Sequence, residues 1–189
     1  INYYAGDGLQ GNEFTHGAFY KDEAGKVYFG GINGITYFQP SSIESVLKDT
    51  KVWITDFSIF NQPVRKNTRS GRHTVIYTSV PDANMFQLAH YDNTFSIVFS
   101  TLQYNNPEQI SYQYKIEELS NQWLSTEPGV NRVTYNNLLP GKYTFHVRAL
   151  SHGNLSEIRT VKILITPPWY EMWWAYCIYA FLFGLLVLG

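Results

Sequence analysis

The sequence is poor in cysteine and in charged residues. One cysteine, Cys177, is present among 189 residues, which excludes a disulfide within the chain and a cysteine-based zinc site. Charged residues make up 15% of the chain, below the roughly 25% typical of soluble domains. Because the net charge is only −1, the chain has no field that would attract nucleic acid, and we expect no nucleic-acid partner.

The sequence also lacks a catalytic or metal-binding pattern. Glu117 and Glu118 are adjacent, so on a strand they point to opposite faces and cannot converge on one substrate bond. The five histidines show no close ligand spacing of the HxxxH kind. The GGING segment has neither the Gly-Lys-Ser/Thr signature nor the helix of a phosphate loop, and we interpret it as a tight turn between strands. We therefore predict no enzymatic activity for this chain, no catalytic, cofactor-binding or metal-binding residues, and no cofactor.

Aromatic residues, in contrast, are abundant. They make up 17% of the chain, and such side chains fit the pleated faces of strands. Three segments alternate apolar and polar residues with the period of a half-buried strand: Phe95–Phe99, Tyr112–Ile116 and Tyr143–Ala149. About seven short strands separated by turn signals are typical of an immunoglobulin-like or fibronectin-like sandwich. The sequence therefore predicts an all-β sandwich over residues 44–168.

Two irregularities accompany this pattern. The apolar phase slips between Ile54 and Phe57, which predicts a bulge in that strand. Pro167 and Pro168 are expected to stop the last strand, because proline cannot continue the hydrogen-bond ladder. We draw no prediction from the segment between Asn61 and Asn84.

Residues 1–43 are dense in turns and contain short apolar runs of four to five residues. Strands of this length, punctuated by glycine and aspartate, indicate a small meander. Asp22 and Glu23 lie in one of the turns, where aspartate commonly bonds its own backbone. So small a meander cannot bury both of its faces, and we expect it to lean on further protein.

The C-terminal tail is apolar. Residues 172–189 contain no charge and no proline over 18 positions, and a membrane-spanning helix needs about 20 residues, with about 17 as the lower limit. We expect a transmembrane helix to begin in residues 169–189, with four aromatic rings at the membrane interface: Trp169, Tyr170, Trp173 and Trp174. A buried core helix is the alternative, which the absence of a polar stripe disfavours.

Two stretches resemble known families. DGLQGNEFTHGAFYKDEAGKVYFGGINGITYFQPSSI resembles the closing blade of two-component-regulator propeller repeats, in its DGL segment, its D-x-x-G turn and its YF-x-P ending. Residues 52–168 resemble the Y_Y_Y domain. The residues that carry this second likeness are Tyr112, Tyr114, Trp123, Gly141 and Tyr143. We expect Tyr112 and Tyr114 to face the core and Trp123 to return to the same core.

The resemblance implies a sensor region of a hybrid two-component system. Residues 1–168 would then be periplasmic, anchored in a bacterial inner membrane, with upstream propeller blades of the same chain and a second copy as partners. Such a region would relay ligand binding in the propellers, with a glycan as the expected ligand, to a cytoplasmic histidine kinase and response regulator. The alternatives are a membrane-tethered sandwich that binds carbohydrate or protein and, less favoured, a membrane-bound hydrolase.

Overall fold

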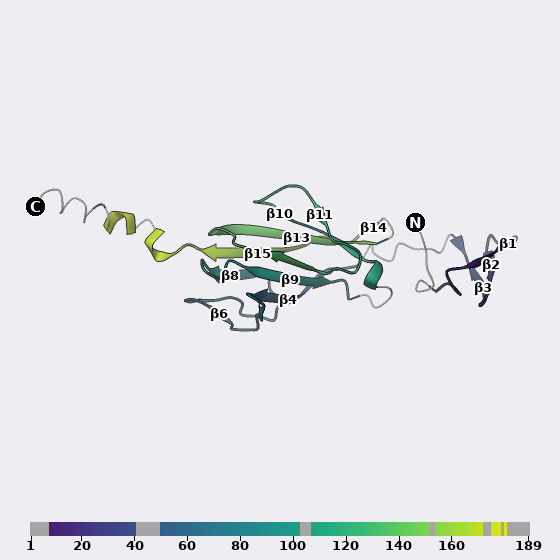
Figure 1. The fold of residues 1–189 in the computed structure, drawn as a ribbon, viewed down its shortest axis with the longest axis horizontal. Coiled ribbons are helices and arrows are strands. Elements are labelled where there is room, and N and C mark those ends of the chain that lie inside the picture. The colour runs from purple at the N-terminus through teal and green to yellow at the C-terminus, as the bar shows by residue number, and fades with distance from the viewer. Residues whose placement is uncertain are drawn as a thin grey trace, which may run out of the picture.

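The computed structural model describes residues 8–40, 50–102, 107–151, 154–171, 175–178 and 180, and strands dominate this part of the chain. Figure 1 shows a three-stranded sheet, a two-sheet sandwich and a C-terminal segment following one another along the long axis of the molecule. The fold is all-β, as the alternation in the sequence predicted.

The N-terminal sheet is an antiparallel meander. It consists of β1 (Phe14–Lys21), β2 (Val27–Gly31) and β3 (Gly34–Phe38) in the order β1-β2-β3. The β1–β2 turn is held by Asp22, whose Oδ1 accepts a hydrogen bond of 2.8 Å from the Lys26 amide. Gly31 pairs with Gly34 across a two-residue turn, and Gly34 has a φ of 132°, which favours glycine. Both turn predictions are confirmed.

Aromatic rings cover both faces of this sheet. Tyr20, Tyr28 and Tyr37 form a row across the three strands, with ring centroids 6.0 and 5.8 Å apart. Phe29, next to Tyr28 on β2, points to the opposite face and contacts Phe14 and Phe38. Exposed apolar residues lie on this sheet, including Phe19 at 71% and Ile35 at 69%. The described residues therefore bury neither face.

The sandwich has a six-stranded and a four-stranded sheet. The first has the order β11-β10-β13-β15-β8, with β14 paired to β13, and the second has the order β12-β9-β4-β5. Their bounds are β4 Trp53–Ile59, β5 Gln62–Pro63, β8 Met85–Ala89, β9 Phe95–Ser100, β10 Ser111–Ile116, β11 Leu124–Ser125, β12 Arg132–Tyr135, β13 Gly141–Ser151, β14 Asn154–Leu155 and β15 Arg159–Thr166. The pairing is antiparallel except between β15 and β8. Two mostly antiparallel sheets packed face to face in this way form an immunoglobulin-like sandwich.

The core lies between the two sheets. Phe57 of β4 stacks on Phe86 of β8 with ring centroids 4.1 Å apart, and Phe95 of β9 lies 5.3 Å from the same ring. The predicted alternation is confirmed in β9 and in β13, where Phe145 and Val147 are fully buried. The register of β4 against β9 shifts between Ile54 and Asp56, which confirms the predicted bulge.

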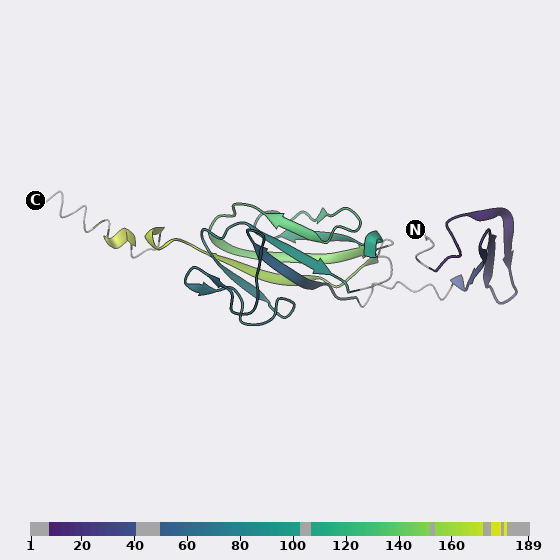
Figure 2. The ribbon, with the colours of Figure 1, turned by 60° about the horizontal axis from the view of Figure 1, so that its bottom comes forward.

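The segment from Asn61 to Asn84, from which no prediction was drawn, is ordered and lies between β4 and β8. It contains β5 and a hairpin of β6 (Arg69–Ser70) and β7 (His73–Thr74). Its buried side chains join the main core: Val64, Val75, Ile76, Val80 and Ala83. Arg159 of β15 holds its far end, because Nη2 donates to the carbonyl oxygens of Pro81 and Ala83. Figures 1 and 2 show the hairpin beside the end of the sandwich from which the C-terminal segment leaves.

The last strand ends at Thr166, directly before the two prolines, as predicted. A short 3₁₀ turn follows at Trp169–Glu171, and residues 175–178 are helical. Over the described part of the chain, no helix is long and apolar enough to cross a membrane. Most of the predicted span, including Trp173 and Trp174, lies outside the described residues.

The stacked phenylalanines give a first prediction. Phe86→Ala should lower the free energy of unfolding by about 3–5 kcal/mol, because it empties a fully buried site between the two sheets. Urea unfolding followed by tryptophan fluorescence measures this loss. Phe19→Ala, at an exposed ring, is the control and should change the value by no more than about 0.5 kcal/mol. Equal midpoints for the two variants would contradict the assigned core.

Candidate functional site

The two tyrosines of β10 are part of the core. Tyr112 is 4% exposed and packs edge-on against Phe99, with ring centroids 4.9 Å apart. Tyr114 is half-buried and lies against the core beside Phe145. Both face inward together with Ile116, as predicted. They stabilise the scaffold rather than line a ligand site.

Trp123 does not return to this core, so that prediction is wrong. Its ring lies on the outer face of the six-stranded sheet, 4.2 Å from the Arg148 guanidinium and 5.3 Å from Lys115 Nζ. Arg148 is fixed by a 2.9 Å hydrogen bond from Nε to Gln113. Alternation turns these three polar side chains outward, and an indole ring is attracted to cations on its face. Trp123 therefore covers the charged surface of the sheet.

Gly141 and Tyr143 form a tyrosine corner at the start of β13. The Tyr143 hydroxyl donates a 2.8 Å hydrogen bond to the Leu139 carbonyl oxygen four residues upstream. Its ring lies over Gly141, where an added Cβ would meet Cζ at 3.5 Å, an ordinary contact. Burial, with a contribution from Glu118, raises the pKa of the Tyr143 hydroxyl. The hydroxyl therefore stays protonated and keeps donating.

The adjacent glutamates serve different partners. Glu118 accepts hydrogen bonds from the Thr144 amide at 2.6 Å and the Thr144 hydroxyl at 2.8 Å. Glu117 Oε2 lies 3.4 Å from Nε2 of His146. Burial alone would raise the pKa of Glu118, but the two bonds from Thr144 outweigh it and lower that pKa below its ordinary value of 4.5. The pair ties the end of β10 to β13 and does not converge on a reacting group.

The described residues contain shallow clefts but no cluster that could hold a metal ion. No group of three or more histidine, cysteine or acidic residues in the described ranges could hold a metal ion. One cleft, of about 240 Å³, is lined by Lys51, Val52, Trp53, Glu157, Ile158 and Arg159. Another, of about 280 Å³, is lined by Phe60, Asn61, Thr94, Phe95, Ser96, Thr134 and Asn136. Neither set contains a histidine.

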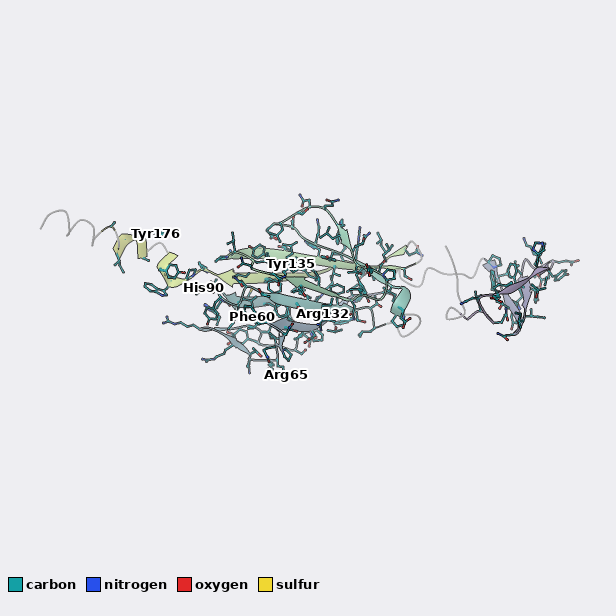
Figure 3. All side chains as sticks on the ribbon, in the orientation of Figure 1. Phe60, Arg65, His90, Arg132, Tyr135 and Tyr176 are labelled. Carbon is teal, nitrogen blue, oxygen red and sulfur yellow. The ribbon has the colours of Figure 1, made fainter. Side chains whose placement is uncertain are left out.

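Outside the core, several contacts hold the end of the sandwich from which the C-terminal segment leaves. Thr166 pairs with Ala89 in the parallel ladder, and its hydroxyl donates to the Leu88 carbonyl oxygen at 3.0 Å. Pro168 is buried. Beyond it, the ring of Tyr170 stands perpendicular to the ring of His90, with centroids 6.5 Å apart. Figure 3 shows His90 at this end of the sandwich. The departing segment is thus docked on the sandwich.

Comparison with known proteins is consistent with this scaffold. Residues 103–166 match the family described as the Y_Y_Y domain. The chain contains a Y_Y_Y domain. The match covers β10 to β15 of the sandwich, whereas the opposing strands β4 and β9 precede it in the chain. The folded unit that contains the Y_Y_Y domain therefore begins before the matched residues.

The relatives of this Y_Y_Y domain chain are sensors. Histidine kinase P4 from Formosa agariphila is 28% identical over 180 residues, which is 94% of this chain and 13% of that protein. The extracellular domain of the hybrid two-component system BT3049 from B. thetaiotaomicron is 30% identical, with a TM-score of 0.64, over 87% of this chain and 22% of that one. The extracellular domain of BT4673 from the same organism is 27% identical, with a TM-score of 0.58, over 77% and 19%.

The chain therefore has the sequence and fold of a sensor region of a hybrid two-component system, as the resemblance predicted. Its solved relatives are extracellular domains. The chain spans about a fifth of the length of those structures and 13% of the curated kinase, so the activity of a whole protein is a matter for proposal.

The tyrosine corner gives a second prediction. Tyr143→Phe removes one hydrogen bond and should lower the free energy of unfolding by about 0.5–1.5 kcal/mol. Thermal or urea unfolding measures the loss. Tyr77→Phe is the matched control, since that ring is 72% exposed, and it should leave stability unchanged. A Tyr143→Phe protein as stable as the control would argue against the corner.

Glu118 gives a third prediction, on pH. Because its folded pKa is lowered, its stabilising contribution is present above the ordinary pKa of 4.5 and is lost as the pH falls through the lower folded value. Glu118→Gln should therefore be less stable than the unmodified chain at neutral pH, and the difference should shrink in acid. Urea unfolding across pH measures this, with the exposed Glu127→Gln as control. A difference that grows toward low pH would refute it.

Proposed function

We propose that this chain is the juxtamembrane periplasmic part of a transmembrane sensor and relays ligand binding in upstream propellers to a cytoplasmic histidine kinase and response regulator. The observation that carries the proposal is the path of the chain through the sandwich. β4 begins at the end nearer the N-terminal sheet, and β15 runs to the opposite end, where the C-terminal segment leaves (Figure 1). A displacement applied at one end thus reaches the other through one folded body.

The body on this path is stiff. β15 is hydrogen-bonded on both sides, to β13 from Arg159 to Ile165 and to β8 from Lys162 to Thr166. Its inward residues Val161, Ile163 and Ile165 are at most 1% exposed. A strand paired on both sides and packed on one face cannot bend without breaking several contacts at once. Thermal motion within the sandwich would therefore not absorb the signal.

The N-terminal sheet supports an upstream partner. Its two aromatic faces are exposed among the described residues, and a three-stranded sheet of this size needs cover to be stable. We infer that residues 1–43 form the last blade of a propeller, with one face against a preceding blade. A glycan bound in that propeller would be the ligand, and two copies of the chain would form the signalling unit. The two copies would have two arrangements relative to each other, and the ligand shifts the equilibrium between them only if it binds them with different affinity.

The C-terminal side supports a membrane connection. Two prolines follow β15 directly and restrict the backbone, where a glycine-serine linker would leave slack. The aromatic residues that follow suit a membrane interface, and we infer that residues 169–189 begin a transmembrane helix.

A binding module is the second candidate. Trp53 lines a cleft together with Lys51 and Glu157, and an aromatic ring beside polar groups suits a sugar. Such a module would not depend on the connection to the membrane.

The fourth prediction tests the relay. A short Gly-Ser insertion between Thr166 and Pro167 in the full-length protein should abolish or strongly reduce the response of kinase output to ligand, because slack uncouples the sandwich from the helix. The same insertion between the exposed residues Ser120 and Asn121 is the control and should leave the response intact. If the insertion after Thr166 leaves the response to ligand unchanged, the relay hypothesis is wrong and the binding module becomes the better-supported function.

A further inference from the structure

A buried serine connects the β6–β7 hairpin to the end of the sandwich. Ser70, at the end of β6, is only 1% exposed. Its hydroxyl donates to Asp92 Oδ2 at 2.5 Å and accepts from the Ala89 amide at 2.7 Å. The Asp92 amide also donates to the Ala89 carbonyl oxygen at 3.0 Å, which closes a turn over residues 89–92. One side chain therefore both donates to this turn and accepts from it.

The hairpin and the turn are packed without spare room. Gly71 follows Ser70 with a φ of 58°, where glycine is favoured. A Cβ at Gly71 would lie 2.6 Å from the Tyr91 hydroxyl and 3.1 Å from the Ala89 Cβ. The glycine lets the hairpin approach the turn closely enough for the serine to reach both of its partners.

The same turn touches the departing C-terminal segment at two points. Ala89 is paired with Thr166, the last residue of β15. The next residue, His90, packs its ring against Tyr91 at 5.0 Å and against Tyr170 at 6.5 Å. The chain of contacts runs from Ser70 through the turn to Tyr170. Figure 3 shows His90 on the C-terminal side of the sandwich.

We propose that Ser70 is a positioning residue, which acts through the turn at 89–92 to fix the direction in which the chain leaves the sandwich. The hairpin that carries it lies outside the residues that match the Y_Y_Y domain. The hairpin thus adds a brace at the point where the proposed relay passes from sandwich to membrane segment. The effect on signalling depends on the proposed function, whereas the effect on the geometry does not.

Loss of the hydroxyl has a defined consequence. Without it, Asp92 loses its donor and the Ala89 amide is left buried with no acceptor. The turn can recover these bonds only by opening to water, and opening moves His90 away from Tyr170. Core contacts such as the Phe57–Phe86 stack involve neither group and stay in place.

Amide hydrogen exchange on the whole chain is the direct test. Ser70→Ala should raise exchange by about tenfold at residues 89–92, as expected for the loss of one buried hydrogen bond, with β9 unchanged. The nuclear Overhauser effect between the rings of Tyr170 and His90 reports the contact itself and should weaken in the same variant. Ser58→Ala is the matched control, because Ser58 is also buried and also donates to an aspartate, Asp56, at 3.2 Å. Asp92→Asn keeps an acceptor for the hydroxyl and should stay close to the unmodified chain.

Three results would overturn the proposal. Faster exchange at 89–92 without a change at Tyr170 would show that the turn does not hold the segment. A uniform rise that includes β9 would reduce Ser70 to a general stabiliser, and an effect of Ser58→Ala equal to that of Ser70→Ala would remove its specificity.

The full-length receptor separates this proposal from the relay. If Ser70→Ala loosens Tyr170 and also changes the response to ligand, both hold. If it loosens Tyr170 while neither it nor the insertion after Thr166 changes the response, Ser70 remains a positioning residue and the relay fails. If the insertion after Thr166 abolishes the response while Ser70→Ala leaves the contact between Tyr170 and His90 unchanged, the relay stands and the positioning role fails.

Discussion

The parallel pairing of β15 with β8 is the constraint on which the rest of the structure depends. It places Thr166 beside Ala89 and so sets the end of the last strand against a turn that belongs to a distant part of the chain. It also brings Phe86 of β8 under the facing sheet, where the ring stacks on Phe57. Core packing and the docking of the C-terminal segment thus rest on one register. A slip of one residue would turn Phe86 outward and separate the two contacts.

The two faces of the six-stranded sheet are stabilised by different kinds of interaction. The inner face is apolar, and the hydroxyl of Tyr143 on this face donates a hydrogen bond to a backbone carbonyl oxygen. The outer face is charged, and Trp123 lies over Arg148 and Lys115 there. Exposed cation–π contacts are worth only about 0.5–1 kcal/mol each, so this layer contributes less to stability than the buried face. The stiffness that a relay requires therefore comes from the inner face and the strand ladders.

The sequence predicted the parts of the fold in which one face of a strand is buried. Alternation located β9, β10 and β13, because a period of two is visible wherever core and solvent lie on opposite sides. Trp123 was assigned to the wrong face. An indole ring after the end of a strand can pack into a core or against cationic side chains, and the sequence does not distinguish the two. The segment between β4 and β8 shows no alternation of apolar and polar residues, because its strands β5, β6 and β7 are only two residues long each. Ser70 and Asp92 were invisible for a related reason: single polar residues far apart in the chain give no periodic signal, and only the folded hairpin joins them.

The end of the sandwich from which the C-terminal segment leaves is held at two points. A sandwich built from strands alone would hold Thr166 through its ladder but leave the chain free to swing at the residues beyond it. Contacts beyond the ladder limit that freedom, since a segment fixed at two points has a direction as well as a position. Thr166 on Leu88 supplies the first point and Tyr170 on His90 the second. The prolines between them limit the backbone torsions that could bypass the second contact. Direction is the quantity that a helix entering a membrane would inherit, and this end of the sandwich is built to set it.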